Sequence, residues 1–123
     1  MITGYINSER QIIIPFDVFS DNGQSTRIRP VMDTGFTDAL TLPPDMIQRL
    51  NLPFRETAIF ELGDGSTVTF NLYTVTIDWD GQMRTIPVLE AEGEPLVGMS
   101  LLYGYRLIAD IVDGGQVFLS LLP

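Results

Sequence analysis

Glycine-containing turns divide this sequence into short apolar runs, and this division restricts its fold more than any other feature. The turns are Asp21-Asn22-Gly23, Gly63-Asp64-Gly65, Asp80-Gly81 and Asp113-Gly114-Gly115. Glycine adopts positive φ at little cost, so Asp-Gly and Asn-Gly favour tight hairpins. The runs between the turns are rich in β-branched and aromatic residues, and 123 residues suit one domain. The sequence therefore predicts an all-β fold in a single domain, residues 1–123, with about eight short strands.

The turn positions and the apolar runs also predict where the individual elements lie. One short helix is expected from Pro43-Pro44 to Leu50, because Met46, Ile47 and Leu50 have helical spacing and proline favours a helix start. Pro30 has no N–H for a ladder, so it indicates an edge or a bulge within its strand. Strands are expected at 11–19, 25–32, 39–42, 55–62, 66–79, 83–89, 105–112 and 116–121.

The longest predicted strand changes the face that carries its apolar residues. Side chains alternate between the two faces of a strand, so a shift in the apolar positions means a bulge or a change of environment. The sequence predicts a hairpin whose tip projects beyond the body and whose base joins the core. The apolar positions are Val68, Phe70 and Leu72 on one face, then Tyr73, Val75, Ile77 and Trp79 on the other.

The composition excludes several classes of function. The chain has no histidine and no cysteine, so a serine–histidine or thiolate nucleophile is impossible. The net charge is −9, and the basic residues are seven scattered arginines, which argues against nucleic acid or an anionic membrane as a partner. No apolar run is long enough to span a bilayer, and the N-terminus lacks the features of a signal peptide. A soluble cytoplasmic protein is expected.

The candidate catalytic group is Asp33 in the motif Asp33-Thr34-Gly35, which directly follows the apolar pair Val31-Met32. A carboxylate at the end of a buried strand, on a turn opened by glycine, is held rigidly. The glycine-tipped hairpin Glu61 to Phe70, the apolar pair plus glycine at Leu96-Val97-Gly98 and a short helix-like segment after it follow in order. This ordered set resembles the retropepsin-like aspartic proteases, the single-domain relatives of pepsin and of retroviral proteases, and is closest to small bacterial members.

The resemblance implies a closed acid-protease barrel with a flap hairpin and one or two short helices. It also implies a homodimeric aspartic endopeptidase in which Asp33 of each subunit activates a water that attacks a peptide bond. Peptide or protein is the expected substrate, and no metal or cofactor is expected. By resemblance, the catalytic motif is Asp33, Thr34 and Gly35, and the substrate-binding residues are Phe36, Thr37, Asp38, Gly63, Asp64, Gly65, Val97 and Gly98.

The chain departs from the family pattern at Phe36, where retroviral enzymes usually have alanine, so substrate specificity is not carried over. It also has Met99-Ser100 where relatives often have Arg or Asp. The apolar segment Val117 to Leu122 is a candidate for dimer contacts.

Several alternatives remain open from the sequence. The first is a catalytically inactive binding or dimerisation module with the same fold, and the second is a glycan hydrolase with two unlike carboxylates. Asp33 on its own also fits a turn residue that caps its own backbone, whereas Asp113 is explained by a hairpin turn.

Overall fold

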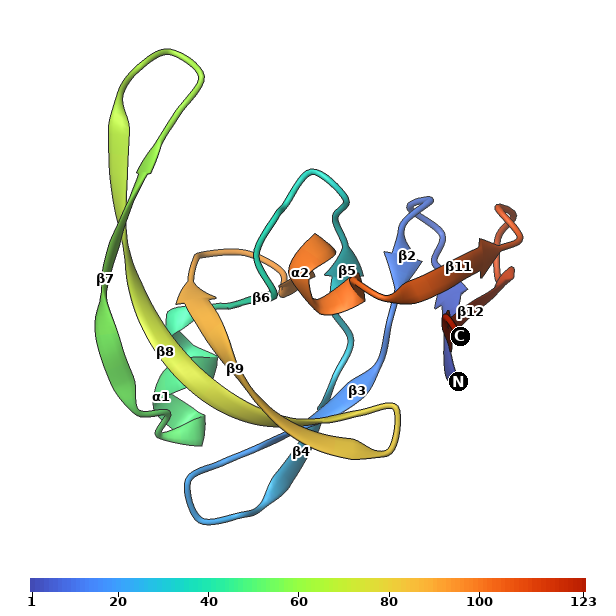
Figure 1. The fold of residues 1–123 in the computed structure, drawn as a ribbon, viewed down its shortest axis with the longest axis horizontal. Coiled ribbons are helices and arrows are strands. Elements are labelled where there is room, and N and C mark those ends of the chain that lie inside the picture. The colour runs from blue at the N-terminus through green and yellow to red at the C-terminus, as the bar shows by residue number, and fades with distance from the viewer.

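The protein folds into a strongly curved sheet with two short helices, as Figure 1 shows. The structure is a computed structural model that describes residues 1–123. The helices are α1 (Pro44–Leu50) and α2 (Met99–Leu102). The strands are β1 (Ile2–Ile6), β2 (Ile12–Ile13), β3 (Phe16–Phe19), β4 (Ser25–Ile28), β5 (Val31–Met32), β6 (Leu40–Leu42), β7 (Phe54–Glu61), β8 (Thr67–Trp79), β9 (Gln82–Glu90), β10 (Leu96–Val97), β11 (Tyr105–Ala109) and β12 (Gln116–Leu121).

All twelve strands belong to one sheet, which confirms the predicted all-β class. Its order is β11-β12-β1-β2-β5-β10-β6-β9-β8-β3-β4, and β7 pairs with β8 outside this path. Most neighbours are antiparallel, but β10 runs parallel to β5, and β6 runs parallel to β9. These parallel pairs bring segments far apart in the sequence together around the end of β5.

Two of the predicted strands are each broken into two by a proline. The predicted strand 11–19 forms β2 and β3, which separate at Pro15, and the predicted strand 25–32 forms β4 and β5, which separate at Pro30. The Pro30 carbonyl accepts a hydrogen bond of 3.0 Å from the Ile14 N–H at this double break. Each proline lacks an N–H, so the chain leaves one ladder there and enters another.

The core contains Trp79, the one tryptophan, at the end of β8 next to the turn of the β8–β9 hairpin. Its ring is 2% exposed and makes edge-to-face contacts with Phe16 and Tyr105, at centroid distances of 5.4 and 6.0 Å. Aromatic pairs favour this geometry because the positive edge of one ring meets the negative face of the other. The core therefore ties strands β3, β8 and β11 together.

Helix α1 begins and ends as predicted. Pro43 and Pro44 open it, Ile47 and Leu50 are buried, and Asn51 ends it with a left-handed φ of 50°. Asn adopts this conformation more readily than most residues, so it is a suitable C-terminal cap. No helix in the structure is long and apolar enough to cross a membrane.

The β7–β8 hairpin projects from the body with its tip away from the core, as predicted (Figure 1). Near the tip, Val68 and Phe70 are half-buried, whereas nearer the base Val75 and Ile77 are buried on the opposite face. The bulge lies in β7, between Phe54 and Glu56, and not in the longer strand. The change of apolar face in β8 therefore marks a change of environment along an unbroken strand.

The C-terminal strands pair within the chain. β12 lies between β1 and β11, and Val117 and Leu119 are buried in the core of the same subunit. β12 therefore has a neighbour within its own subunit, β1, a strand that the sequence did not predict. The expectation that Val117 to Leu122 makes dimer contacts stays a prediction. The predicted strand 105–112 ends at Ala109, which leaves Ile111 and Val112 in an exposed loop.

Candidate active site

Asp33 lies at the end of a strand that has neighbours on both sides. Val31 of β5 pairs with Ile13 of β2 and with Leu96 of β10. The Asp33 N–H then donates a hydrogen bond of 2.9 Å to the Val97 carbonyl, which extends the pairing by one residue. Asp33 itself is half-buried. The backbone of the candidate catalytic residue is therefore held by the sheet, although its side chain remains accessible.

The turn after Asp33 fixes the orientation of its carboxylate. Asp33 Oδ1 accepts a hydrogen bond of 2.9 Å from the Gly35 N–H, and the Asp33 carbonyl accepts one of 3.1 Å from the Phe36 N–H. A Cβ at Gly35 would lie 3.3 Å from Asp33 Oδ1, which is a tight contact. Glycine therefore leaves space for the carboxylate, and the second carboxylate oxygen has no bond within the chain. Thr34 and Thr37 are exposed in the same loop.

Gly98 lies directly beneath this loop. A Cβ at Gly98 would be 2.2 Å from the Asp38 carbonyl oxygen and 2.5 Å from Cδ2 of Phe36. The Gly98 N–H donates to the Ala39 carbonyl at 3.0 Å, and the Met99 N–H donates to the Phe36 carbonyl at 2.8 Å. Val97 and Gly98 are buried and do not line the open cleft. They support its floor from below.

A cleft of about 430 Å³ lies between the Asp33 loop and the β7–β8 hairpin. The loop contributes polar groups, while the hairpin and the strands behind it contribute apolar side chains. Phe60 and Phe70 pack edge to face across the hairpin at 5.4 Å. The cleft is lined by Asp33, Gly35, Phe36, Thr37, Asp38, Thr41, Phe60, Glu61, Leu62, Val68, Phe70, Leu89, Ala91 and Leu96. The cleft is thus mostly apolar, with a few carboxylates.

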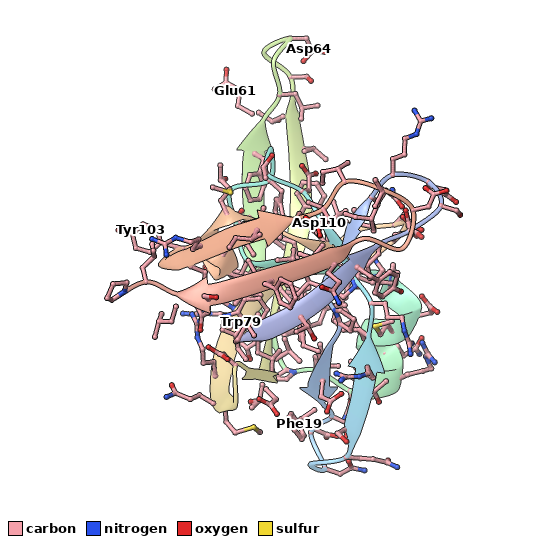
Figure 2. All side chains as sticks on the ribbon, turned by 90° about the vertical axis from the view of Figure 1, so that its right-hand side faces the viewer. Phe19, Glu61, Asp64, Trp79, Tyr103 and Asp110 are labelled. Atoms are coloured by element: carbon pink, nitrogen blue, oxygen red, sulfur yellow. The ribbon has the colours of Figure 1, made fainter.

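The predicted tip residues Gly63, Asp64 and Gly65 form the turn of the hairpin and do not line the cleft of a single subunit. Asp64 stands at the far end of the hairpin in Figure 2. Its carboxylate accepts hydrogen bonds from the Ser66 hydroxyl and N–H, and these bonds hold the pKa of Asp64 below its usual value. Gly65 has φ +85°, which favours glycine.

Thr41 was missed as a site residue. It is 6% exposed and lines the cleft, and its hydroxyl accepts a hydrogen bond of 2.9 Å from the Leu96 N–H. Both neighbours, Leu40 and Leu42, are also buried, so β6 shows no alternation that would mark one polar position. The only signal in the sequence was a threonine between two leucines in a short strand, which is weak.

The charged groups of the cleft are all acidic. Asp33, Asp38 and Glu61 line it, and no arginine does. Nowhere in the structure do three or more Asp or Glu side chains gather in a cluster that could hold a metal ion. The chemistry available from the chain's own groups at this site is therefore carboxylate chemistry.

One solved structure is similar to this chain in its fold. The chain superposes on the crystal structure of a retropepsin-like aspartic protease from Rickettsia conorii with a TM-score of 0.58 and 22% sequence identity, over 96% of this chain and 87% of the other. This chain has the retropepsin-like fold. The sequence matches no protein-family model and no curated protein. In the retropepsin-like fold of this chain, Asp33 lies on the loop above Val97-Gly98, and the β7–β8 hairpin covers the cleft beside it.

Proposed function

We propose that the protein is a homodimeric aspartic endopeptidase in which Asp33 of each subunit activates one water molecule. The observation that carries this proposal is the placement of Asp33. Its backbone is fixed by β10, its Oδ1 is oriented by the Gly35 N–H, and it faces an apolar cleft. A carboxylate needed only for a turn has no reason to face such a cleft.

The proposed chemistry needs two carboxylates that share one proton. Like charges a few ångströms apart resist double ionisation, so the two carboxylates hold one proton between them. The ionised carboxylate takes a proton from the water as the water attacks the peptide carbonyl, and the protonated carboxylate donates to the carbonyl oxygen. The carboxyl group that took the water proton then gives it to the amide nitrogen, and the other carboxylate takes back a hydroxyl proton from the tetrahedral intermediate. The C–N bond breaks, and the pair again holds one proton. Each chain supplies one such aspartate, so the second comes from a copy across a two-fold axis.

The other predicted residues take supporting roles in this proposal. Thr34 braces the two Asp33 loops against each other, and Phe36, Thr37 and Asp38 form the side of the cleft that contacts substrate. The turn at Gly63, Asp64 and Gly65 closes over the substrate as a flap and excludes water. Apolar residues on the hairpin, such as Phe60, hold apolar substrate side chains.

The test is cleavage of a mixed peptide library between pH 4 and 7 by the wild type and by Asp33→Asn. We expect the substitution to abolish cleavage, because an amide can neither ionise nor share the proton. Asp113→Asn is the matched control, since Asp113 also precedes glycine in a turn but lies outside the cleft. Equal cleavage by the wild type and Asp33→Asn, or no cleavage by either, would favour the inactive module.

A second carboxylate in the same cleft, Asp38, keeps the glycan-hydrolase alternative testable. In the peptidase proposal, Asp38→Asn changes substrate preference but not the reaction. Subunits of wild type and Asp33→Asn are then mixed. Mixed dimers without activity support a shared pair of Asp33 residues, whereas full activity from each wild-type subunit contradicts it.

A further inference from the structure

One edge of the sheet is formed by β11, and its composition differs from that of the other free edges. β11 is bonded to β12 on one side only. Leu107, on one face of β11, is 42% exposed, and Ile108, on the other face, is 55% exposed. Ile111 and Val112 extend the apolar surface beyond the strand and are 65% and 64% exposed. Its one charged side chain is Arg106. An apolar edge with free N–H and C=O groups is a template for pairing with another chain.

The other two free edges are protected in the usual ways. β4 is short, and its exposed residues are Ser25, Thr26 and Arg27. β7 also exposes apolar side chains, Phe54 at 58% and Ile59 at 72%. Three of its residues are charged, however, namely Arg55, Glu56 and Glu61, whereas β11 has one charged residue. Charges and short length discourage pairing between chains. β11 is thus the edge suited to a partner.

The orientation of β11's free backbone groups follows from its bonds to β12. The Asp110 N–H donates to the Gln116 carbonyl at 3.0 Å, and the Gly104 carbonyl accepts from the Leu122 N–H at 2.9 Å. In an antiparallel ladder the residues that bond to one neighbour alternate with those that face away. Even-numbered residues of this segment therefore face β12, and Tyr105, Leu107 and Ala109 present their N–H and C=O groups at the free edge.

Charge complementarity selects both the occupant of this edge and its register. Arg106 and Asp110 lie on the same face of the segment, on either side of Ile108, and neither forms an ion pair within the subunit. If two copies of β11 pair antiparallel about Ile108, Arg106 of each copy stands opposite Asp110 of the other. Leu107 then exchanges backbone hydrogen bonds with Ala109 of the second copy. Pairing centred on Leu107 would instead place Arg106 opposite Ile108.

We infer that the dimer forms by antiparallel pairing of β11 with β11 of a second copy, centred on Ile108 and fixed by two Arg106–Asp110 pairs. This inference rests on the proposed function for its choice of a second copy as partner. It differs from the prediction for Val117 to Leu122, because β12 has neighbours on both sides and β11 does not. The pairing covers Leu107 and Ile108 and joins two sheets into one.

The edge is also well placed to bring two catalytic loops together. In Figure 1 the tip of the β7–β8 hairpin, the loop between β5 and β6 and the β11–β12 loop all reach the upper side of the molecule. Figure 2 shows β11 and β12 on one face below the hairpin tip, with Tyr103 and Asp110 near the two ends of β11. The short helix α2, followed by Tyr103 and Gly104, connects β11 to Gly98 beneath the Asp33 loop. β11 and the floor of the Asp33 loop are therefore joined by one short segment of chain, from Gly98 to Gly104.

The absence of cysteine allows a direct test with single-cysteine variants. In the proposed register, Ile108 faces its own copy in a pair that is not hydrogen-bonded, with Cα atoms about 4.5 Å apart. This separation is within the range of a disulfide. We expect Ile108→Cys to form a covalent dimer with oxidised glutathione, seen on a non-reducing gel. Leu107→Cys is the matched control, because its two Cα atoms would be about 8 Å apart and should not be linked.

Charge reversal tests the register independently. Arg106→Asp and Asp110→Arg each place like charges opposite each other twice, so we expect each to weaken the dimer about tenfold by analytical ultracentrifugation. The double variant restores opposite charges and should return within about threefold of the wild type. Arg49→Asp, on the exposed face of α1, should leave the dimer unchanged.

The outcomes separate this inference from the proposed function. A wild-type dimer with peptidase activity that depends on Asp33, but no crosslink through Ile108→Cys, would overturn the β11 interface and leave the function standing. Crosslinking through Leu107→Cys alone would overturn the register. A strictly monomeric wild type would overturn the interface and the homodimeric enzyme together, while a crosslinked dimer without peptidase activity would support the interface and contradict the function.

Discussion

Gly98→Ala gives the sharpest test of how the floor supports the Asp33 loop. The added methyl group would lie 2.2 Å from the Asp38 carbonyl oxygen and 2.6 Å from the Phe36 carbonyl oxygen. Both are backbone atoms, so no side-chain rotation relieves the contact. The loop has to move by a substantial part of an ångström, or the strand beneath it has to shift. Either movement changes the position of Asp33, because the Asp33 N–H is hydrogen-bonded to the carbonyl of Val97, the residue before Gly98.

The expected loss of stability is the sum of two terms. Overpacking in a well-packed region costs about 1–3 kcal/mol. The displacement also weakens the bonds from the Gly98 N–H to Ala39 and from the Met99 N–H to Phe36, each contributing about 1 kcal/mol. We therefore expect the free energy of unfolding to fall by about 3 kcal/mol. For a urea slope near 1.5 kcal/mol per molar, this is a fall of about 2 M in the midpoint.

Urea denaturation followed by the fluorescence of Trp79 measures this change, because Trp79 is the one tryptophan and is buried. All variants are compared at one protein concentration, since association stabilises the folded state. Gly63→Ala is the matched control: no atom lies within 4 Å of the added methyl group, and its midpoint should not fall. A Gly98→Ala midpoint within about 0.5 M of the wild type would refute the close contact. Peptidase activity should fall in Gly98→Ala beyond the loss of folded protein.

Two further predictions concern single hydrogen bonds. Thr41→Val leaves the Leu96 N–H without its hydrogen-bond acceptor, so we expect the free energy of unfolding, measured by urea denaturation, to fall by about 2 kcal/mol. Thr41→Ser keeps the hydroxyl, and we expect a fall of about 1 kcal/mol. A larger fall for Thr41→Ser than for Thr41→Val would contradict the role of this bond. Ser66→Ala removes the hydroxyl bond to Asp64, so the pKa of Asp64 should rise toward its usual value in an NMR carboxyl titration. Because the folded-state pKa of Asp64 is the lower one, its contribution to stability is present above the usual aspartate pKa and is lost as the pH falls through the folded-state value. An unchanged titration of Asp64 would contradict the second prediction.

Local signals predicted the elements that depend on neighbouring residues. Helix α1 follows from Pro44 and the spacing of Ile47 and Leu50, and the β7–β8 hairpin follows from the glycine turn at its tip. In these segments the residues that determine the conformation are close in sequence. The position of Asp33 at the end of an apolar strand was likewise readable from Val31-Met32.

Long-range pairing was not predictable in the same way. β1 is a strand because Ile2 pairs with Leu119, at the other end of the chain, and no local pattern indicates that contact. The loop that shortens β11 is another case. A Cβ at Gly115 would lie 1.8 Å from the Asp110 carbonyl, so the chain closes tightly there and Ile111 leaves the ladder. The sequence showed a glycine turn but not how closely its two ends approach.

The division between fixed and free backbone is the physical basis of the proposed reaction. β5, which leads into Asp33, has neighbours on both sides and a buried floor, so Asp33 keeps its position without a bound ligand. The β7–β8 hairpin has an outer edge with no neighbour, and most side chains of β7 are exposed. Segments with few buried contacts open at low free-energy cost. In the proposed reaction, the half of the cleft that holds the Asp33 carboxylate is therefore the rigid half, and the half that admits the peptide is free to move. The monomer presents one Asp33, so the proposed reaction needs a contact outside the subunit, and β11 is the edge inferred for it.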